Sequence, residues 1–332
     1  MINPSMLADQ PDFLAAQSQL GHDAPLEYAM SAPLLGLPLL LRSNSPAVMA
    51  AAERAFGGWR SLDPALIEQA PPLRVDLVVH GALGERGPGL TPTSHVFHGE
   101  SYIAAGAGSL LSAHTGRGEG LAFVSPALAA DEPNLRHGVI ECLALLLASA
   151  HDRTPVHAGA VVRNGRAALL IGPSMRGKST LCYACVRAGF SLLAEDVVYV
   201  SQSRGLRLWG NPNRIHLLPD ARRYFPELRA IEPQVQANGK HKLAVTVADE
   251  QLERSAERAI ICLLERRLGQ TSTLDRLPTA EAIFALAQSN EPGFDLYSRD
   301  RAAAALAAGG AYRLVMGSEL SGAVALLEQV LQ

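Results

Sequence analysis

The sequence predicts an α/β protein in which a larger C-terminal core follows a smaller α+β domain. With 332 residues, the chain exceeds the usual size of one domain, so two domains are expected. In the C-terminal part, short apolar runs alternate with segments of helical period, which is typical of a sheet covered by helices. A glycine-rich segment at residues 172–179 joins one such run to one such helix.

The N-terminal part is predicted to begin with an arm, residues 1–25, that has no hydrophobic period, followed by a domain over residues 26–140. Ser45 and Pro46 form a helix-start signal before a helix at 47–56. Apolar or alternating runs predict strands at residues 35–42, 73–79, 95–104 and 120–124. Residues 88–92 are expected to form a loop, and residues 116–120 a hairpin turn.

A helix at residues 135–150 is expected to lead into the C-terminal domain, residues 141–332, with the boundary between 133 and 154. Strands are predicted at residues 167–171, 190–200 and 312–316, and the segment 258–266 is predicted to hold the strand ICLLE. Helices are predicted from Thr180 to Gly189, from Thr279 to residue 289, at 299–308, and after Ser318, which should cap the last helix.

The segment from Gly172 fits the phosphate-binding pattern G-x-x-x-x-G-K-[ST] in its expected setting between strand and helix. Glycine lets main-chain N–H groups approach phosphate oxygens, and these groups converge at the N-terminus of the following helix. Lys178 can reach the β and γ phosphates, and the Ser179 hydroxyl can ligate Mg²⁺. The predicted nucleotide-binding residues are Gly172, Pro173, Ser174, Met175, Arg176, Gly177, Lys178, Ser179 and Thr180.

Glu195 and Asp196 interrupt the apolar run at 190–200. Two carboxylates inside a buried strand would be costly unless a cation or hydrogen bonds compensate them; the alternative is an exposed strand end. Because adjacent strand residues point to opposite faces, the two acids should have different roles. We assign Asp196 to Mg²⁺ and Glu195 to the general base, and the two roles could be exchanged.

Two other pairs suggest metal or redox sites but are better explained by structure. Cys182 and Cys185 lie on the apolar stripe of the predicted helix, and neither a second CxxC motif nor a Cys–His pair accompanies them, so they should pack in the core. His95 and His98 fall in a predicted strand, where residues three apart face opposite sides, so a shared metal is not expected.

Residues 156–200 resemble the catalytic core of the HPr kinase/phosphorylase superfamily, especially its HPr-kinase-related and lasso-peptide serine kinase branch. The resemblance is carried by His157-Ala158 before the loop, a short hairpin at residues 163–166, the phosphate-binding loop and the paired acid. The run at 211–220 is similar to a segment that follows in these relatives. The chain departs from the family at Glu195, where Asp is usual, and at Met175-Arg176, where small residues are common.

The resemblance implies a P-loop-containing mixed-sheet core related to phosphoenolpyruvate carboxykinase, and transfer of the γ-phosphoryl group of ATP to a serine-like hydroxyl. It implies that His157 orients the paired acid or a phosphate oxygen, although a lone histidine in an apolar strand is more often a core residue. The migrating phosphate needs positive charge, and most of the cations after the acids are expected to be solvated surface residues. Among them we select Arg214 as catalytic because it lies in the family-like run at 211–220, and then Lys240 or Lys242.

Composition fits a protein of the reducing cytoplasm. The net charge is only −3, so nucleic acid and membrane are not expected partners. There are four cysteines, no secretory signal and no apolar run of membrane-spanning length. The resulting interpretation is a kinase that uses ATP and Mg²⁺ on a peptide or protein, with the N-terminal domain recognising the acceptor. A small-molecule kinase and a non-catalytic nucleotide-binding regulator remain alternatives, and the resemblance leaves room for a homo-oligomer.

Overall fold

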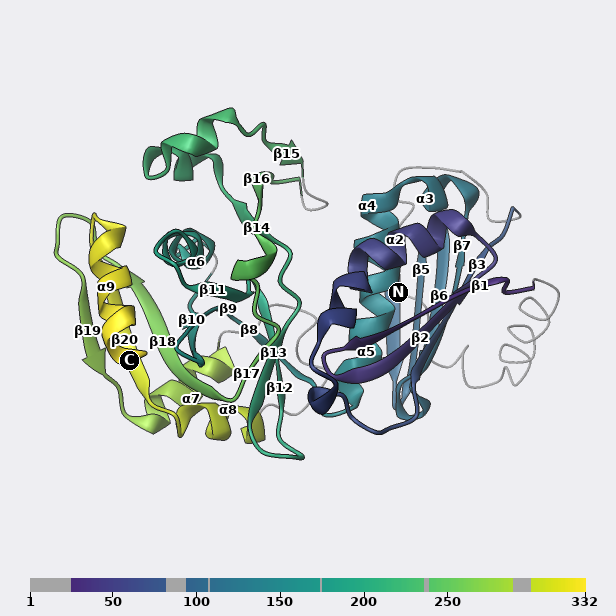
Figure 1. The fold of residues 1–332 in the computed structure, drawn as a ribbon, viewed down its shortest axis with the longest axis horizontal. Coiled ribbons are helices and arrows are strands. Elements are labelled where there is room, and N and C mark those ends of the chain that lie inside the picture. Colours follow the sequence, from purple (N-terminus) through teal and green to yellow (C-terminus); the bar gives the residue numbers. More distant parts are fainter. Residues whose placement is uncertain (1–24, 82–93, 107, 174, 236–238, 289–299) are drawn as a thin grey trace. The chain divides into compact units, whose positions relative to one another are not determined.

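The computed structural model describes residues 25–81, 94–106, 108–173, 175–235, 239–288 and 300–332 (Figure 1). The chain divides into two compact units, Met1–His151 and Asp152–Gln332, and each is described by itself. Both combine helices with sheets of mixed strand direction, so the fold is mixed α/β.

The N-terminal unit is built on a seven-stranded sheet of order β1-β2-β3-β7-β6-β5-β4. Its strands are β1 (Tyr28–Leu34), β2 (Leu37–Ser43), β3 (Leu73–Val79), β4 (Ser94–His98), β5 (Ser101–Gly106), β6 (Ser109–His114) and β7 (Glu119–Val124). Strands β2, β3 and β7 run parallel, and the other neighbouring pairs are antiparallel.

Helices pack on this sheet through small and branched apolar residues. The α-helices are α2 (Pro46–Phe56), α3 (Pro126–Ala130), α4 (Glu132–Leu135) and α5 (Cys142–Ala150), with a π-helical turn, η5 (Arg136–Glu141), between the last two. The 3-10 turns are η2 (Gly57–Ser61), η3 (Pro64–Leu66) and η4 (Thr115–Arg117).

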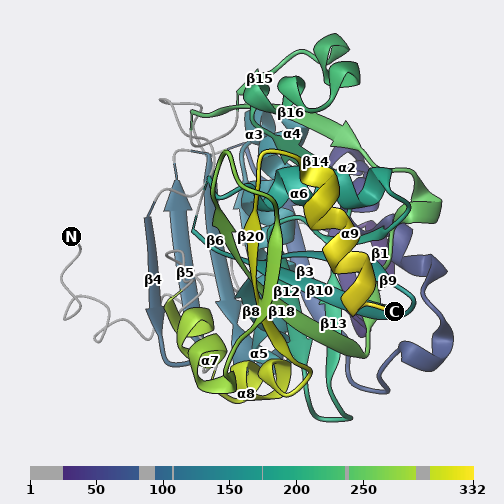
Figure 2. The same cartoon turned by 90° about the vertical axis from the view of Figure 1, so that its left-hand side faces the viewer.

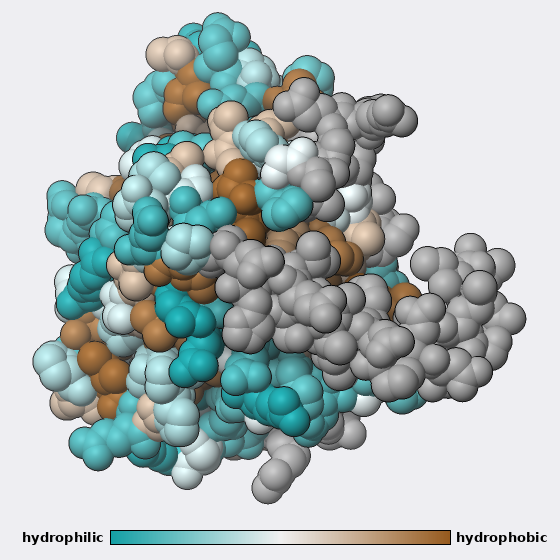
Figure 3. Space-filling model, turned by 90° about the vertical axis from the view of Figure 1, so that its right-hand side faces the viewer, coloured by the Kyte–Doolittle hydropathy of each residue, from teal (hydrophilic) through white to brown (hydrophobic). Residues whose placement is uncertain are grey.

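Where Figure 3 is coloured, hydrophobic residues form small groups separated by hydrophilic ones.

The C-terminal unit contains three sheets. A six-stranded sheet has the order β11-β9-β10-β18-β20-β19, a four-stranded sheet β17-β13-β12-β8, and a three-stranded sheet β14-β16-β15. The strands are β8 (Thr154–His157), β9 (Gly159–Arg163), β10 (Arg166–Ile171), β11 (Ser191–Ala194), β12 (Val197–Ser201), β13 (Arg207–Gly210), β14 (Arg214–Leu217), β15 (Gln234–Val235), β16 (His241–Thr246), β17 (Ser255–Ala256), β18 (Arg258–Arg266), β19 (Thr273–Arg276) and β20 (Ala311–Met316).

Helices cover both faces of the six-stranded sheet, and each face has its own core (Figure 2). On one face lie α6 (Lys178–Arg187) and α9 (Leu320–Val330), and on the other α7 (Thr279–Gln288) and α8 (Asp300–Ala307). The 3-10 turns here are η6 (Pro219–Arg223), η7 (Pro226–Ala230) and η8 (Asp249–Gln251). Residues alternate between the two cores along β10 and β18, as expected of strands buried on both sides.

In the N-terminal unit, β3 has the predicted bounds. The turn between β6 and β7 is formed by residues 115–118, so it overlaps the predicted turn at 116–120, whose last two residues begin β7. The strand predicted at 35–42 is wrong at its start, because Leu35 and Gly36 form a turn with positive φ and β2 begins at Leu37. The strand predicted at 95–104 is wrong as one element, because Gly99, with φ of 57°, turns the chain between β4 and β5. The arm and the loop at 88–92 lie outside the described residues.

Helix α5 belongs to the N-terminal unit, since it packs on β3, β6 and β7 and the division between the units follows His151. The predicted domains placed this helix at the start of the C-terminal part. In the C-terminal unit, β18 contains the predicted strand ICLLE and extends beyond it at both ends. Ser318 does not cap the last helix: Glu319 is the N-cap residue, and Ser318 Oγ accepts a hydrogen bond from the Gly269 amide at 2.9 Å.

Candidate functional site

The two acids lie where the chain passes between two sheets. Strand β8 belongs to the four-stranded sheet and β9 to the six-stranded one, and the chain returns from β11 to β12 through Glu195 and Asp196. The two passages are joined, because the Ala158 amide donates to the Asp196 carbonyl at 2.9 Å and His157 is in register with Val197. The acids therefore stand in a bend at a strand end, and the predicted continuous strand at 190–200 is wrong.

Gly159 allows this crossing to sit close to helix α6. A methyl group added at Gly159 would lie 2.8 Å from Cys182 Sγ and 3.1 Å from the Glu195 carbonyl oxygen. Cys182 and Cys185 are fully buried in the core on this face, and burial raises the pKa of both thiols. Their placement is that of apolar packing residues under the site.

The predicted phosphate-binding loop leaves β10 after Ile171 and enters helix α6 at Lys178. Gly177, the residue before the helix, has φ of 91°, which glycine adopts without strain. Met175 also has a positive φ, 69°, and its side chain is 80% exposed at the tip of the loop. Ser174 lies outside the described residues, and the helix begins at Lys178 rather than at Thr180 as predicted.

The Lys178 side chain folds along the loop. It is buried, and its ammonium group donates to the Gly172 carbonyl at 2.7 Å. A second contact, to the Pro173 carbonyl, is at 3.5 Å. The ammonium group is therefore held by the backbone of the loop itself, at the base of helix α6.

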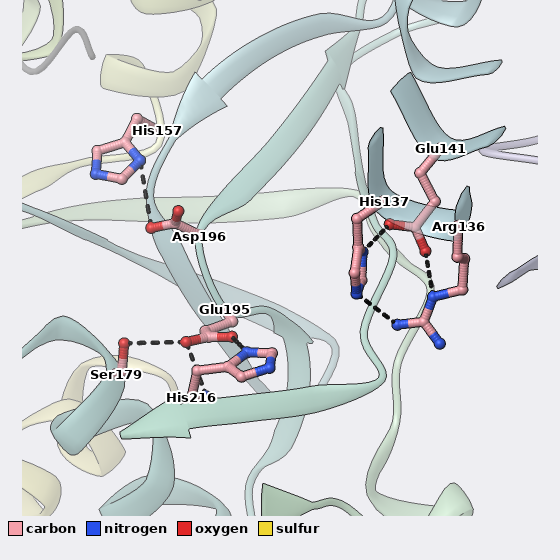
Figure 4. A network of polar contacts seen from close by, with 8 residues as sticks. All are labelled: Arg136, His137, Glu141, His157, Ser179, Glu195, Asp196 and His216. Atoms are coloured by element: carbon pink, nitrogen blue, oxygen red, sulfur yellow. Dashed lines mark hydrogen bonds and ion pairs between the residues drawn. The ribbon is translucent and has the colours of Figure 1, made fainter. Parts of the chain in front are cut away.

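Glu195 is held by residues from two different elements (Figure 4). Ser179 Oγ of helix α6 donates to Glu195 Oε1 at 3.3 Å, and the His216 amide of strand β14 donates to the same oxygen at 2.9 Å. His216 Nδ1 lies 2.7 Å from Glu195 Oε2. The Glu195 side chain is only 16% exposed. Both of its carboxylate oxygens thus have polar partners.

Asp196 has a different environment. Its side chain is 61% exposed, and its Oδ1 lies 3.4 Å from Nδ1 of His157, which is buried (Figure 4). The two adjacent acids therefore face different partners, one joined to the predicted loop by Ser179 and the other open to solvent beside a histidine.

The three cations predicted after the acids lie on or next to strands β14 and β16. Arg214 lies on β14, two residues before His216 and so on the same face of that strand. It is exposed, and its side chain makes no hydrogen bond or ion pair with another described residue. Lys242, on β16, pairs with Gln234 of β15, and Lys240 is exposed just before β16. Among the described residues, neither Arg214 nor Lys242 forms a side-chain hydrogen bond or ion pair with Glu195 or Asp196.

The residue that sequence reasoning missed is His216. It lies in the run at 211–220 that carried part of the resemblance, and the strand period places it on the same face as Arg214. A histidine side chain can donate a hydrogen bond to a carboxylate, and this could have suggested such a role from the sequence. Only the fold shows that the carboxylate is that of Glu195.

The oxygen donors near the loop are compatible with Mg²⁺. Ser179 Oγ and Glu195 Oε1 lie 3.3 Å apart, and Mg²⁺ at nucleotide sites commonly takes one or two protein oxygens with water and phosphate oxygens completing the shell. Within the described part of the chain no three His, Cys, Asp or Glu side chains gather as a metal site, so a dedicated protein cage is not what these residues form.

Figure 4 also draws a polar cluster of the N-terminal unit. His137 Nδ1 lies 2.6 Å and Arg136 Nε 3.2 Å from the two oxygens of Glu141. All three residues belong to the π-helical turn η5, a form that is rare and occurs mostly as single turns within α-helices. The cluster pairs the charges within that turn.

No protein-family model matches the sequence, and no curated protein matches it. The chain is similar to a solved structure of the Hpr(Ser) kinase/phosphatase from Coxiella burnetii, with 13% identity over 53% of this chain and 87% of that one, at a TM-score of 0.28. At these values the similarity does not establish a family for the chain. In the described residues, no helix is both long and apolar enough to cross a membrane.

Proposed function

We propose that the C-terminal unit is an ATP-dependent phosphotransferase that transfers the γ-phosphoryl group to a hydroxyl of a peptide or protein. The observation that carries the proposal is the contact between Ser179 of the loop helix and Glu195, with Asp196 beside His157. The resemblance of residues 156–200 to the HPr kinase/phosphorylase superfamily supports the same reaction class.

The contacts favour an exchange of the roles first assigned to the two acids. Glu195 shares the Ser179 contact and is mostly buried, which suits a ligand of Mg²⁺. Asp196 is exposed, so it can reach an acceptor that comes from solvent, and His157 can orient its carboxylate. In this assignment Ser179 and Glu195 hold the metal, and Asp196 is the general base.

The proposed reaction needs three contributions from the chain: phosphate binding, metal binding and removal of a proton. The amides of the loop at 172–179 and the Lys178 ammonium group hold the phosphates. When bound at Ser179 and Glu195, Mg²⁺ supplies positive charge that offsets the phosphate charge. Asp196 takes the proton of the acceptor hydroxyl while the oxygen of that hydroxyl forms a bond to the γ-phosphorus. The bond between that phosphorus and the β–γ bridging oxygen breaks, and ADP leaves.

The test separates binding from transfer. The protein is incubated with Mg²⁺ and γ-labelled ATP, alone and with candidate acceptor peptides, and label transfer and ATP binding are both measured. We expect Lys178→Ala to weaken ATP binding, and Asp196→Asn to retain Mg·ATP binding while transfer falls by about 10²–10⁴-fold. Glu257→Gln, which alters an exposed carboxylate paired with Arg207, serves as the control.

The outcomes distinguish the roles of the two acids from the proposed activity as a whole. Transfer that is unchanged by Asp196→Asn but abolished by Glu195→Gln at saturating Mg²⁺ would return the base role to Glu195. Mg·ATP binding without transfer to any acceptor would favour the nucleotide-binding regulator. A protein that binds no ATP would overturn the proposal as a whole.

A further inference from the structure

Arg266 ends the strand that runs beside the loop strand. Strands β10 and β18 are parallel, with Ile171 in register with Leu263. Carboxyl ends of parallel strands meet at one edge of a sheet, and this is the edge at which ligands bind in open α/β folds. The predicted phosphate-binding loop leaves β10 immediately after Ile171, so Arg266 is carried to the same edge.

The strand alternation also places Arg266 on the side of helix α6. Cys262 and Leu264 belong to the core under α6, and Arg266 follows them at the same period. A methyl group added at Gly177 would lie 3.7 Å from Arg266 Nη1 and 3.3 Å from Met316 Cε. The guanidinium group therefore lies beside the first residues of helix α6, where the amides of the loop converge.

Arg266 differs from two nearby arginines because its partner is a neutral side chain and not a carboxylate. Arg267 and Arg313 each pair with Glu265 at 3.1 Å. Arg266 instead donates to the Tyr224 hydroxyl and lies over its ring at 5.5 Å, and no carboxylate of the described residues forms an ion pair with it. A neutral partner thus orients the guanidinium group without neutralising it.

We infer that Arg266 binds the terminal phosphates of a nucleoside triphosphate held by the loop at 172–179, and that Tyr224 positions it for this contact. The inference rests on the proposed function and adds a residue to the nucleotide site. A guanidinium group can make two parallel hydrogen bonds to phosphate oxygens, which makes arginine suited to this task. It also supplies the positive charge that phosphoryl transfer requires, which sequence reasoning sought at Arg214.

The test is calorimetric binding of Mg·ATP, Mg·ADP and AMP to the full chain and its variants. We expect Arg266→Gln to raise the Kd of Mg·ATP by about ten- to hundredfold, with a smaller change for ADP and the least for AMP. Arg266→Lys should lose less, because it keeps the charge. Tyr224→Phe, which removes only the hydroxyl, should give an intermediate loss. Arg267→Gln is the matched control and should bind as the wild type does.

The outcomes distinguish this inference from the function on which it rests. Wild-type protein that binds Mg·ATP, together with an Arg266→Gln variant of the same affinity, would overturn the role of Arg266 and leave the phosphotransferase standing. The role of Arg266 would also be overturned if Arg266→Gln weakened the binding of Mg·ATP and AMP equally. It would be overturned, too, if Arg267→Gln weakened Mg·ATP binding as much as Arg266→Gln does. If Arg266→Gln does not fold, as judged by its unfolding temperature, Arg266→Lys and Tyr224→Phe decide. Wild-type protein that binds no nucleotide would overturn both proposals.

Discussion

Replacing His216 with alanine should raise the Mg²⁺ concentration that half-saturates nucleotide binding. The substitution keeps the backbone amide that donates to Glu195 Oε1 at 2.9 Å and removes the Nδ1 contact to Oε2 at 2.7 Å. Because the carboxylate is only 16% exposed, water replaces that partner poorly. A hydrogen bond to a charged group is worth about 1.5–3 kcal/mol, which corresponds to about a ten- to hundredfold loss in metal affinity.

The assay is a Mg²⁺ titration at fixed ATP, followed by the fluorescence of a nucleotide analogue, with the half-saturating Mg²⁺ concentration as the readout. His216→Asn should recover part of the loss, since an asparagine amide can donate from a position similar to Nδ1. His241→Ala, on the exposed start of β16, is the control. Equal half-saturating concentrations in His216→Ala and in the control would refute the idea that His216 prepares Glu195 for the metal.

Two further predictions concern stability and thiol reactivity. Gly210→Ala should destabilise the C-terminal unit by about 3 kcal/mol or prevent its folding, because the added methyl group would lie 1.7 Å from the Leu193 carbonyl oxygen; chemical unfolding measures this, and Gly81→Ala, with nothing within 4 Å, should change little. Burial raises the pKa of the Cys262 thiol to about 12, and raises those of the other buried cysteines, so their thiolate fraction at pH 8 is small. Alkylation at pH 8 followed by mass spectrometry should therefore label these thiols only after unfolding, and rapid labelling of the native protein would contradict this packing. The buried thiols are those of Cys182, Cys185 and Cys262.

The local features of the C-terminal unit could be predicted because short-range chemistry determines them. Asn164 and Gly165 both have positive φ, as a tight hairpin between β9 and β10 requires. Asparagine followed by glycine is a sequence signal for such a turn. The apolar run before the loop, the glycine at position 177 and the helical period after it each depend on neighbours in the sequence. The central run of strand β18 was predicted because its apolar residues are continuous.

Elements that depend on distant contacts could not be predicted in the same way. The turn between β1 and β2 uses Leu35 at φ of 51°, and leucine gives no turn signal. Glu195 and Asp196 were expected within one strand, because an apolar run does not show that its two halves join different sheets. The contact from His216 to Glu195 spans 21 positions of the chain and exists only once β14 has been placed.

The passage between the sheets explains how two adjacent carboxylates can differ in chemistry. In a continuous strand they would face opposite sides of one sheet, and one of them would be buried among apolar residues without compensation. In the observed bend, Glu195 turns toward Ser179 and His216, while Asp196 remains exposed beside His157. The bend thus holds one acid beside the loop and leaves the other exposed to solvent, and this difference supports the proposal that Glu195 binds the metal and Asp196 acts as the general base.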